Sequence, residues 1–248
     1  MHPGKIEIDR VSDPRIIVAL DVHTSSELRK LVAQISDTHC RVKIGKELFT
    51  SLGPAAIEIC HQEGLEVFLD LKFHDIPSTC AKAVRAAARW GVWMLNVHCL
   101  GGTEMMQAAR EAIDAETNRP KLVGVTVLTS MTEISLRSMG VNRSLEDQVD
   151  SLASQAQTAG LDGVVCSGQE ARRLRQDCGN EFCLVTPGVR PIWSQSNDQM
   201  RVVTPKEAIA YGSDYLVIGR PITASDSPAS IIESISSEIA SCSIERGF

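Results

Sequence analysis

The chain has 248 residues, 43% of them hydrophobic and 23% charged, and its formal net charge is −6. This length and composition suit a single α/β barrel or two small globular domains. The negative charge disfavours nucleic acid or an anionic membrane as the main partner, but it leaves room for a local positive site.

Residues 1–13 are expected to form a short arm before the first strand. Their start, MHPGKIEIDR, lacks the apolar core of a secretory leader, and no apolar run in the chain approaches the ~18 residues of a membrane span. The eight cysteines include no CxxC pair, which is typical of reduced, structural thiols. We therefore expect a cytoplasmic protein.

Short apolar runs rich in β-branched residues recur along the rest of the chain. They are nearly continuous in hydrophobic residues, as is typical of strands covered on both faces in a parallel sheet. We predict eight strands, at 15–22, 40–45, 66–73, 94–99, 121–128, 163–167, 183–189 and 215–221.

Helical patterns lie between these runs. Thr24 and Glu27 have the spacing of a capping box, Thr204 and Glu207 repeat it, and 144–160 is an amphipathic segment that ends in glycine. Alternating strands and helices without a linker predict a (β/α)8 TIM barrel, with one catalytic domain at 14–248. An open doubly wound sheet is the main alternative, but no glycine-rich phosphate loop follows the first strand.

Charged residues gather where the first three strands end. Asp21, Lys43, Asp70, Lys72 and Asp75 alternate in sign, and Asp70 and Lys72 are two residues apart on one strand. Strand ends meet at one mouth of a barrel, and alternating charges make such a cluster tolerable. A structural salt-bridge network is the alternative, but five such residues from three strands favour a functional site.

The last two strands provide candidate phosphate ligands. Gly219 and Arg220 end the eighth strand, and Arg190 and Gln199 lie in the long connection 188–203. Phosphate often binds after strands seven and eight of such barrels. The position of His98 at a strand end indicates a structural histidine more than a catalytic one, and His74 is expected to pack in a loop. The sequence contains no metal-binding pattern.

Several motifs resemble those of the orotidine 5′-monophosphate decarboxylase family, in particular its bacterial branch. They are ALDV, VKIG, DLKFHDIPST, VTVLTSM, DGVVCS, LVTPGVRP and DYLVIGRPIT, and they extend over nearly the whole chain. The resemblance implies a carboxy-lyase that converts orotidine 5′-monophosphate to UMP in the last step of de novo pyrimidine synthesis. It also implies a homodimer, with neither a cofactor nor a metal.

The resemblance assigns roles to individual residues. Lys72 would donate a proton to C6 of the pyrimidine, Asp70 would lie against the leaving carboxylate, and Asp21 and Lys43 would bind the ribose. Asp75, Ile76 and Thr79 would reach into the active site of the partner subunit. Thr129, or the nearby Thr132, would contact the pyrimidine. The 5′-phosphate would be held by Arg190, Gln199, Gly219 and Arg220. The connection 188–203 would close over the substrate.

Three other functions compete with this interpretation. A related barrel that acts on a phosphorylated keto sugar would share Asp-x-Lys-x-x-Asp but would use Mg²⁺ to hold an enediolate. A Schiff-base aldolase would use Lys43 or Lys72, and a non-catalytic barrel would bind UMP without turnover. The continuation Ile-Pro-x-Thr after Asp75 favours the nucleotide enzyme.

Overall fold

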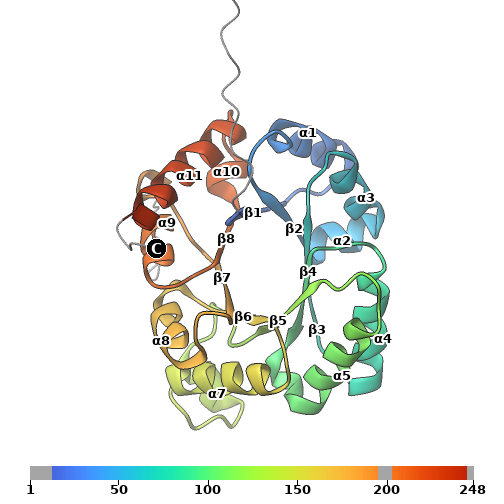
Figure 1. The fold of residues 1–248 in the computed structure, drawn as a ribbon, viewed down its shortest axis with the longest axis vertical. Coiled ribbons are helices and arrows are strands. Elements are labelled where there is room, and N and C mark those ends of the chain that lie inside the picture. The colour runs from blue at the N-terminus through green and yellow to red at the C-terminus, as the bar shows by residue number, and fades with distance from the viewer. Residues whose placement is uncertain (1–12, 195–202, 245–248) are drawn as a thin grey trace, which may run out of the picture.

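In the computed structural model, residues 13–194 and 203–244 are described, with side chains up to residue 240. Eight strands form a closed barrel in which each strand pairs in parallel with the next and the last pairs with the first, so the predicted TIM barrel is confirmed (Figure 1). The strands are β1 (Ile16–Ala19), β2 (Arg41–Gly45), β3 (Val67–Phe73), β4 (Met94–His98), β5 (Lys121–Val125), β6 (Gly163–Val165), β7 (Cys183–Pro187) and β8 (Tyr215–Ile218).

The helices form a ring outside the barrel (Figure 1). They are α1 (Ser25–Ile35), α2 (Lys46–Leu52), α3 (Ala55–Gln62), α4 (Pro77–Ala88), α5 (Gly102–Asp114), α6 (Glu133–Ser138), α7 (Leu145–Thr158), α8 (Gly168–Cys178), α9 (Pro205–Ala210), α10 (Arg220–Thr223) and α11 (Pro228–Ile244). Two short 3-10 turns, Cys99–Gly101 and Ile192–Ser194, lie in the connections.

Capping interactions fix where several helices begin. Both predicted capping boxes are present: the Thr24 hydroxyl accepts from the backbone N–H of Glu27, and the Thr204 hydroxyl accepts from that of Glu207. A third box, between Ser167 and Glu170, opens α8 and was missed in the sequence. Each box satisfies backbone donors that a helix start would otherwise leave unpaired.

The apolar core has two layers. Ile17, Phe68, Met94, Val185 and Val217 belong to an inner cluster contributed by the strands alone, and a larger cluster joins the strands to the helices. Within the described residues, no helix is both long enough and apolar enough to cross a membrane.

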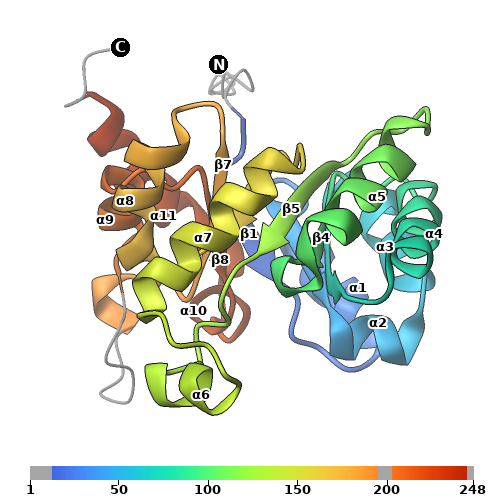
Figure 2. The ribbon, with the colours of Figure 1, turned by 90° about the horizontal axis from the view of Figure 1, so that it is seen from below.

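The two ends of the barrel differ in what covers them. In Figure 2, α6 and α10 lie at the end where the strands finish, and the chain enters β1 from the opposite end. The connection between β5 and α7 contains α6. The connection 188–203 contains a bridge between Val189 and Val203, and its residues 195–202 lie outside the described part of the chain.

Candidate active site

Two lysines share one carboxylate at the end where the strands finish. Lys72 Nζ lies 2.6 Å from Asp70 Oδ1, and Lys43 Nζ lies 3.2 Å from Asp70 Oδ2. The side chains of Lys43 and Asp70 are each 13% exposed, and that of Lys72 is 26% exposed. Two ammonium groups against one carboxylate leave this centre with a surplus positive charge, which suits an anionic ligand.

The lysines keep Asp70 ionised. Burial alone would raise the pKa of Asp70, but the charges of Lys43 and Lys72 and hydrogen bonds from Lys72 and Asn96 together lower it below its usual value. The carboxylate is therefore charged at neutral pH, and each of its oxygens faces one ammonium group.

The backbone of β3 is irregular at this centre. Its ladder with β4 shifts register between Leu69 and Phe73, and Lys72 has a φ of +52°, the only positive φ of a non-glycine residue in the described chain. The simple alternation expected from the sequence is therefore not the reason that Lys72 meets Asp70. A bulge turns the lysine toward the carboxylate instead.

Asn96 on β4 belongs to the same centre and was not predicted from the sequence. This residue is fully buried, and its amide donates to Asp70 Oδ1 at 2.7 Å. A polar residue inside the apolar run MLNVHC was the available signal, because a buried amide needs partners.

The expected five-residue charge network is linked through only three members in the described chain. Asp21 and Asp75 make no ion pair with another described residue, and both are exposed. Asp21 Oδ2 lies only 3.1 Å from where a Cβ would stand on Gly219, so glycine there allows the close approach of β1 and β8.

The loop after β3 carries the residues expected to reach a second subunit. Asp75 Oδ1 accepts from the backbone N–H of Ile76 at 2.7 Å. Ile76 is 65% exposed, and Thr79 is exposed in the first turn of α4. These three residues therefore lie at the surface of the single chain.

The candidate phosphate ligands follow β7 and β8, which are neighbours in the barrel. Arg220 is exposed at the first position of α10, directly after Gly219. The backbone N–H of Arg190 donates to the carbonyl of Val203 at 3.1 Å, which joins the two ends of the β7 connection. Gln199 lies outside the described residues.

The two threonines proposed for the pyrimidine differ in their contacts. Thr129 is exposed in the turn after β5, and Thr132 is the N-cap of α6, where its hydroxyl accepts from the backbone N–H of Ser135. The Thr132 hydroxyl therefore already has a local partner.

His98 and His74 stack on one another, with ring centroids 5.3 Å apart. Burial, followed by the nearby His74, Lys46 and Lys72, lowers the pKa of His98 to about 4. His98 is thus neutral at pH 7, and its Nδ1 accepts from the backbone N–H of Leu100. Within the part of the chain that the structure describes, no three His, Cys, Asp or Glu side chains are grouped to hold a metal ion.

A family model described as "Orotidine 5'-phosphate decarboxylase / HUMPS family" matches residues 14–235. The chain belongs to this family. A curated relative from Vibrio cholerae, named orotidine 5'-phosphate decarboxylase, is 53% identical over 230 residues, which cover 92% of this chain and 100% of the relative. The protein of the same name from Saccharophagus degradans is 50% identical over 234 residues, which cover 94% and 98%.

A solved structure gives the same relationship in three dimensions. The crystal structure of orotidine 5'-phosphate decarboxylase from Lactobacillus acidophilus superimposes with a TM-score of 0.81 at 37% identity, and the match covers 92% of this chain and 99% of that chain. The family description also names a second group, HUMPS, so membership alone leaves the reaction to be argued from the site and from the named relatives.

Proposed function

We propose that this protein is a carboxy-lyase that decarboxylates orotidine 5′-monophosphate to UMP, the last step of de novo pyrimidine synthesis, without a cofactor. The observation that carries the proposal is the pair of ammonium groups around Asp70 at the mouth of the barrel. Curated relatives with 50% or more identity over nearly their whole length, which are named for this activity, support it.

Charge stabilisation is the main demand of the chemistry. When the bond from C6 to the carboxyl carbon breaks, CO2 leaves and the electron pair remains on C6 as a carbanion. The ammonium of Lys72 would attract this charge and then transfer a proton to C6, and the neutral amine would regain a proton from solvent. The side chain of Lys72 is held by Asp70 at 2.6 Å, so little rearrangement is needed.

Asp70 and Lys43 would complete the reacting centre. Because Asp70 stays ionised, it would repel the substrate carboxylate more than it repels the neutral product CO2. Lys43, with Asp21 two residues after the neighbouring strand β1, would bind the ribose hydroxyls, and β1 and β2 pair at Ala19 and Lys43.

Binding at the two ends of the nucleotide would supply the energy for closure of the connection 188–203 over the substrate. Arg190, Gly219 and Arg220 would hold the 5′-phosphate with Gln199, and Thr129 would face the pyrimidine. Arginine can meet a phosphate with two parallel hydrogen bonds, and the exposed Arg220 is available for such a contact. Contacts far from the bond that breaks can favour closure of the connection 188–203 and the exclusion of water.

A homodimer in which each active site is shared between the two subunits would complete this arrangement. We expect the protein to be cytoplasmic. The supporting observation is that, among the described residues, Asp75 has only a local hydrogen bond, from the backbone N–H of the adjacent Ile76, which is 65% exposed. In an equal mixture of Lys72→Ala and Asp75→Asn subunits, about a quarter of the sites would contain both native residues. We expect recovered activity of that order, and no recovery despite verified subunit exchange would exclude shared sites.

The decisive experiment is an ultraviolet assay of orotidylate conversion by purified, metal-stripped protein. The expected result is UMP formation at an unchanged rate in EDTA. A rate that vanished with EDTA and returned with Mg²⁺ would favour the alternative of an enediolate enzyme acting on a phosphorylated keto sugar. Borohydride trapping of the protein with substrate would reveal a Schiff base at Lys43 or Lys72, and binding of UMP without turnover would indicate a non-catalytic barrel.

A further inference from the structure

Asn96 connects two members of the charged centre from the neighbouring strand. Its Nδ2 donates to Asp70 Oδ1 at 2.7 Å, and its Oδ1 accepts from the backbone N–H of Lys72, also at 2.7 Å. The residue is fully buried and lies two positions after Met94, which belongs to the inner apolar cluster. Side chains two apart on a regular strand share a face, so Asn96 faces the barrel interior.

The bulge in β3 makes this amide necessary. Between the pairs Leu69–Leu95 and Phe73–Val97, the three residues 70–72 of β3 lie opposite the single residue Asn96. A regular parallel ladder would offer a backbone carbonyl to the N–H of Lys72, but a bulge interrupts that ladder. The side chain of Asn96 takes the place of the missing carbonyl, and a buried N–H is thereby satisfied.

The same amide fixes the orientation of the Asp70 carboxylate. Oδ1 receives both the Lys72 ammonium at 2.6 Å and the Asn96 amide at 2.7 Å, and Oδ2 is left to face Lys43 at 3.2 Å. A carboxylate without the amide could turn about its Cβ–Cγ bond and change both contacts. Asn96 therefore constrains the backbone of Lys72 and the plane of Asp70 together.

We propose that Asn96 is a positioning residue for the decarboxylation proposed above, holding the left-handed backbone of Lys72 and the Asp70 carboxylate so that the ammonium stands where C6 will be protonated. It acts through these two residues and does not itself touch the substrate. This inference rests on the proposed function for its chemistry, but the two can fail separately.

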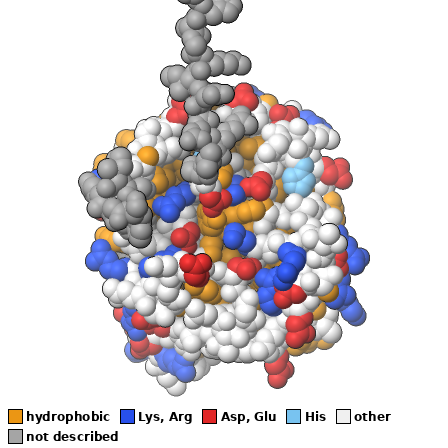
Figure 3. All heavy atoms as spheres, viewed as in Figure 1, with side chains coloured by type: hydrophobic (Ala, Val, Ile, Leu, Met, Phe, Trp, Pro, Cys, Tyr) orange, Lys and Arg blue, Asp and Glu red, His pale blue; other side chains and the backbone are white. Residues whose placement is uncertain are grey.

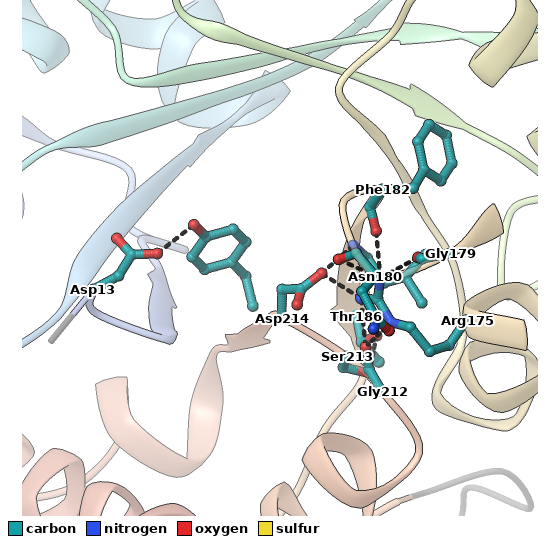
Figure 4. Close-up of polar contacts among 11 residues, drawn as sticks. Asp13, Arg175, Gly179, Asn180, Phe182, Thr186, Gly212, Ser213 and Asp214 are labelled. Carbon is teal, nitrogen blue, oxygen red and sulfur yellow. Dashed lines mark hydrogen bonds and ion pairs between the residues drawn. The ribbon is translucent and has the colours of Figure 1, made fainter. Parts of the chain in front are cut away.

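The test compares two substitutions with a matched control. Asn96→Leu removes both hydrogen bonds, and Asn96→Ser serves if the leucine variant does not fold. We expect kcat to fall by about 10- to 100-fold, the usual effect of a misplaced reacting group, with KM within about threefold. The control is Thr186→Val, which breaks an equally buried hydrogen bond, to Ser213 at 2.7 Å, and should leave kcat unchanged (Figure 4).

Asn96→Asp gives a readout that loss of stability would not produce. The aspartate keeps an acceptor for the N–H of Lys72, but in its ionised form it opposes Asp70 with a second carboxylate. When protonated, it can donate to Asp70 as the amide does. Its kcat should therefore rise toward the parent value as the pH falls, and the leucine variant should show no such recovery.

The outcomes separate the two proposals. Normal kcat in Asn96→Leu, equal losses in Asn96→Leu and Thr186→Val, or no acid recovery in Asn96→Asp would each overturn the positioning role. If the parent protein does not convert orotidylate, the proposed function fails, and carbon NMR titration of Asp70 still tests Asn96. The pKa of Asp70 should then be higher in Asn96→Leu than in the parent, and an unchanged pKa would overturn the inference.

Discussion

Strand β2 carries one cation toward each end of the barrel, and the two are satisfied very differently. Arg41 begins the strand, and its side chain, 6% exposed, contacts Asp13 at 2.7 Å, Glu66 at 2.8 Å and the carbonyl of Pro14 at 2.6 Å. The guanidinium also lies 3.9 Å from the ring centre of Trp93. Two residues later, Lys43 shares the single carboxylate of Asp70 with Lys72.

The end of the barrel where the strands begin is thus balanced in charge. Figure 3 shows acidic and basic side chains together around its centre. The hydroxyl of Tyr215 donates to the carboxylate of Asp13, which is labelled in Figure 4. At the other end two ammonium groups compete for one carboxylate. A cation whose hydrogen-bond and ion-pair partners are all present has a structural role, whereas a surplus positive charge indicates a place for an anionic ligand.

The largest expected effect comes from removing one of the two ammonium groups that face Asp70. Lys72→Ala should lower kcat/KM by about a thousandfold or more, because a positioned general acid alone contributes about 10²–10⁴-fold and charge stabilisation adds to it. The unfolding free energy should change little, since Lys43 and Asp70 remain as a one-to-one pair. The assay should be paired with chemical denaturation, and the exposed Lys30→Ala is the control.

A Lys72→Ala protein that kept a rate within tenfold of the parent would contradict the assigned acid. A variant that lost its fold would instead show that Lys72 is needed for stability, which would contradict the view that it is a surplus charge at this end of the barrel.

At the opposite end, the same kind of change should affect stability instead of catalysis. Arg41→Ala removes a packed guanidinium with three polar partners, and we expect a loss of about 2–4 kcal/mol of unfolding free energy. Denaturant titration measures this loss, and kcat/KM should stay within about threefold. A large fall in kcat with unchanged stability would reverse the comparison between the two ends.

Arg220→Ala should have an intermediate effect, on binding. Losing one charge-assisted contact to phosphate costs about 1.5–3 kcal/mol, which corresponds to a rise in KM of about 10- to 100-fold. Selectivity for orotidylate over orotidine should fall with it. Arg29→Ala, an exposed arginine on α1, is the matched control for charge. If the parent protein converted orotidine as well as its phosphate, the phosphate contact would have no role.

The fold was predictable because the strands are continuous apolar runs, and all eight lie within the predicted ranges. Several predicted strands extend too far at their ends, as at Leu20 and Val127. These residues are 1% and 7% exposed, so apolar burial continues into the barrel mouth after the ladder has ended. The short helix α6 was missed because six residues carry too little periodicity to recognise.

The charged centre was partly predictable for the same geometric reason, since the ends of parallel strands meet. The sequence placed Lys43, Asp70 and Lys72 at strand ends, and the structure brings these three together. The bulge in β3 and the role of Asn96 were not predictable, because a register shift depends on contacts between strands and leaves no period in the sequence.

The smallest expected effect is a pH dependence of stability caused by His98. This histidine is neutral at pH 7, so only the lysines contribute positive charge to the centre. The pKa of His98 is about 4 in the folded protein and about 6.5 in an unfolded chain, so the folded state binds fewer protons between these values. Its contribution to stability is therefore complete above pH 6.5 and declines as the pH falls toward 4. Asp70, whose folded pKa is below the ordinary ~3.9, contributes its own loss only at lower pH.

Between pH 7 and pH 5, the parent should therefore lose about 1 kcal/mol more unfolding free energy than His98→Gln, after allowance for the partial exposure of the ring. Denaturant titrations at both pH values measure the difference, and His61→Gln, at an exposed position, should behave like the parent. Equal losses in the parent and His98→Gln would mean that folding does not lower the pKa of His98, so that its imidazole would be charged in the folded protein below about pH 6.5. At those pH values the centre would hold a third cation beside Lys72, and the surplus of charge would no longer belong to the two lysines alone.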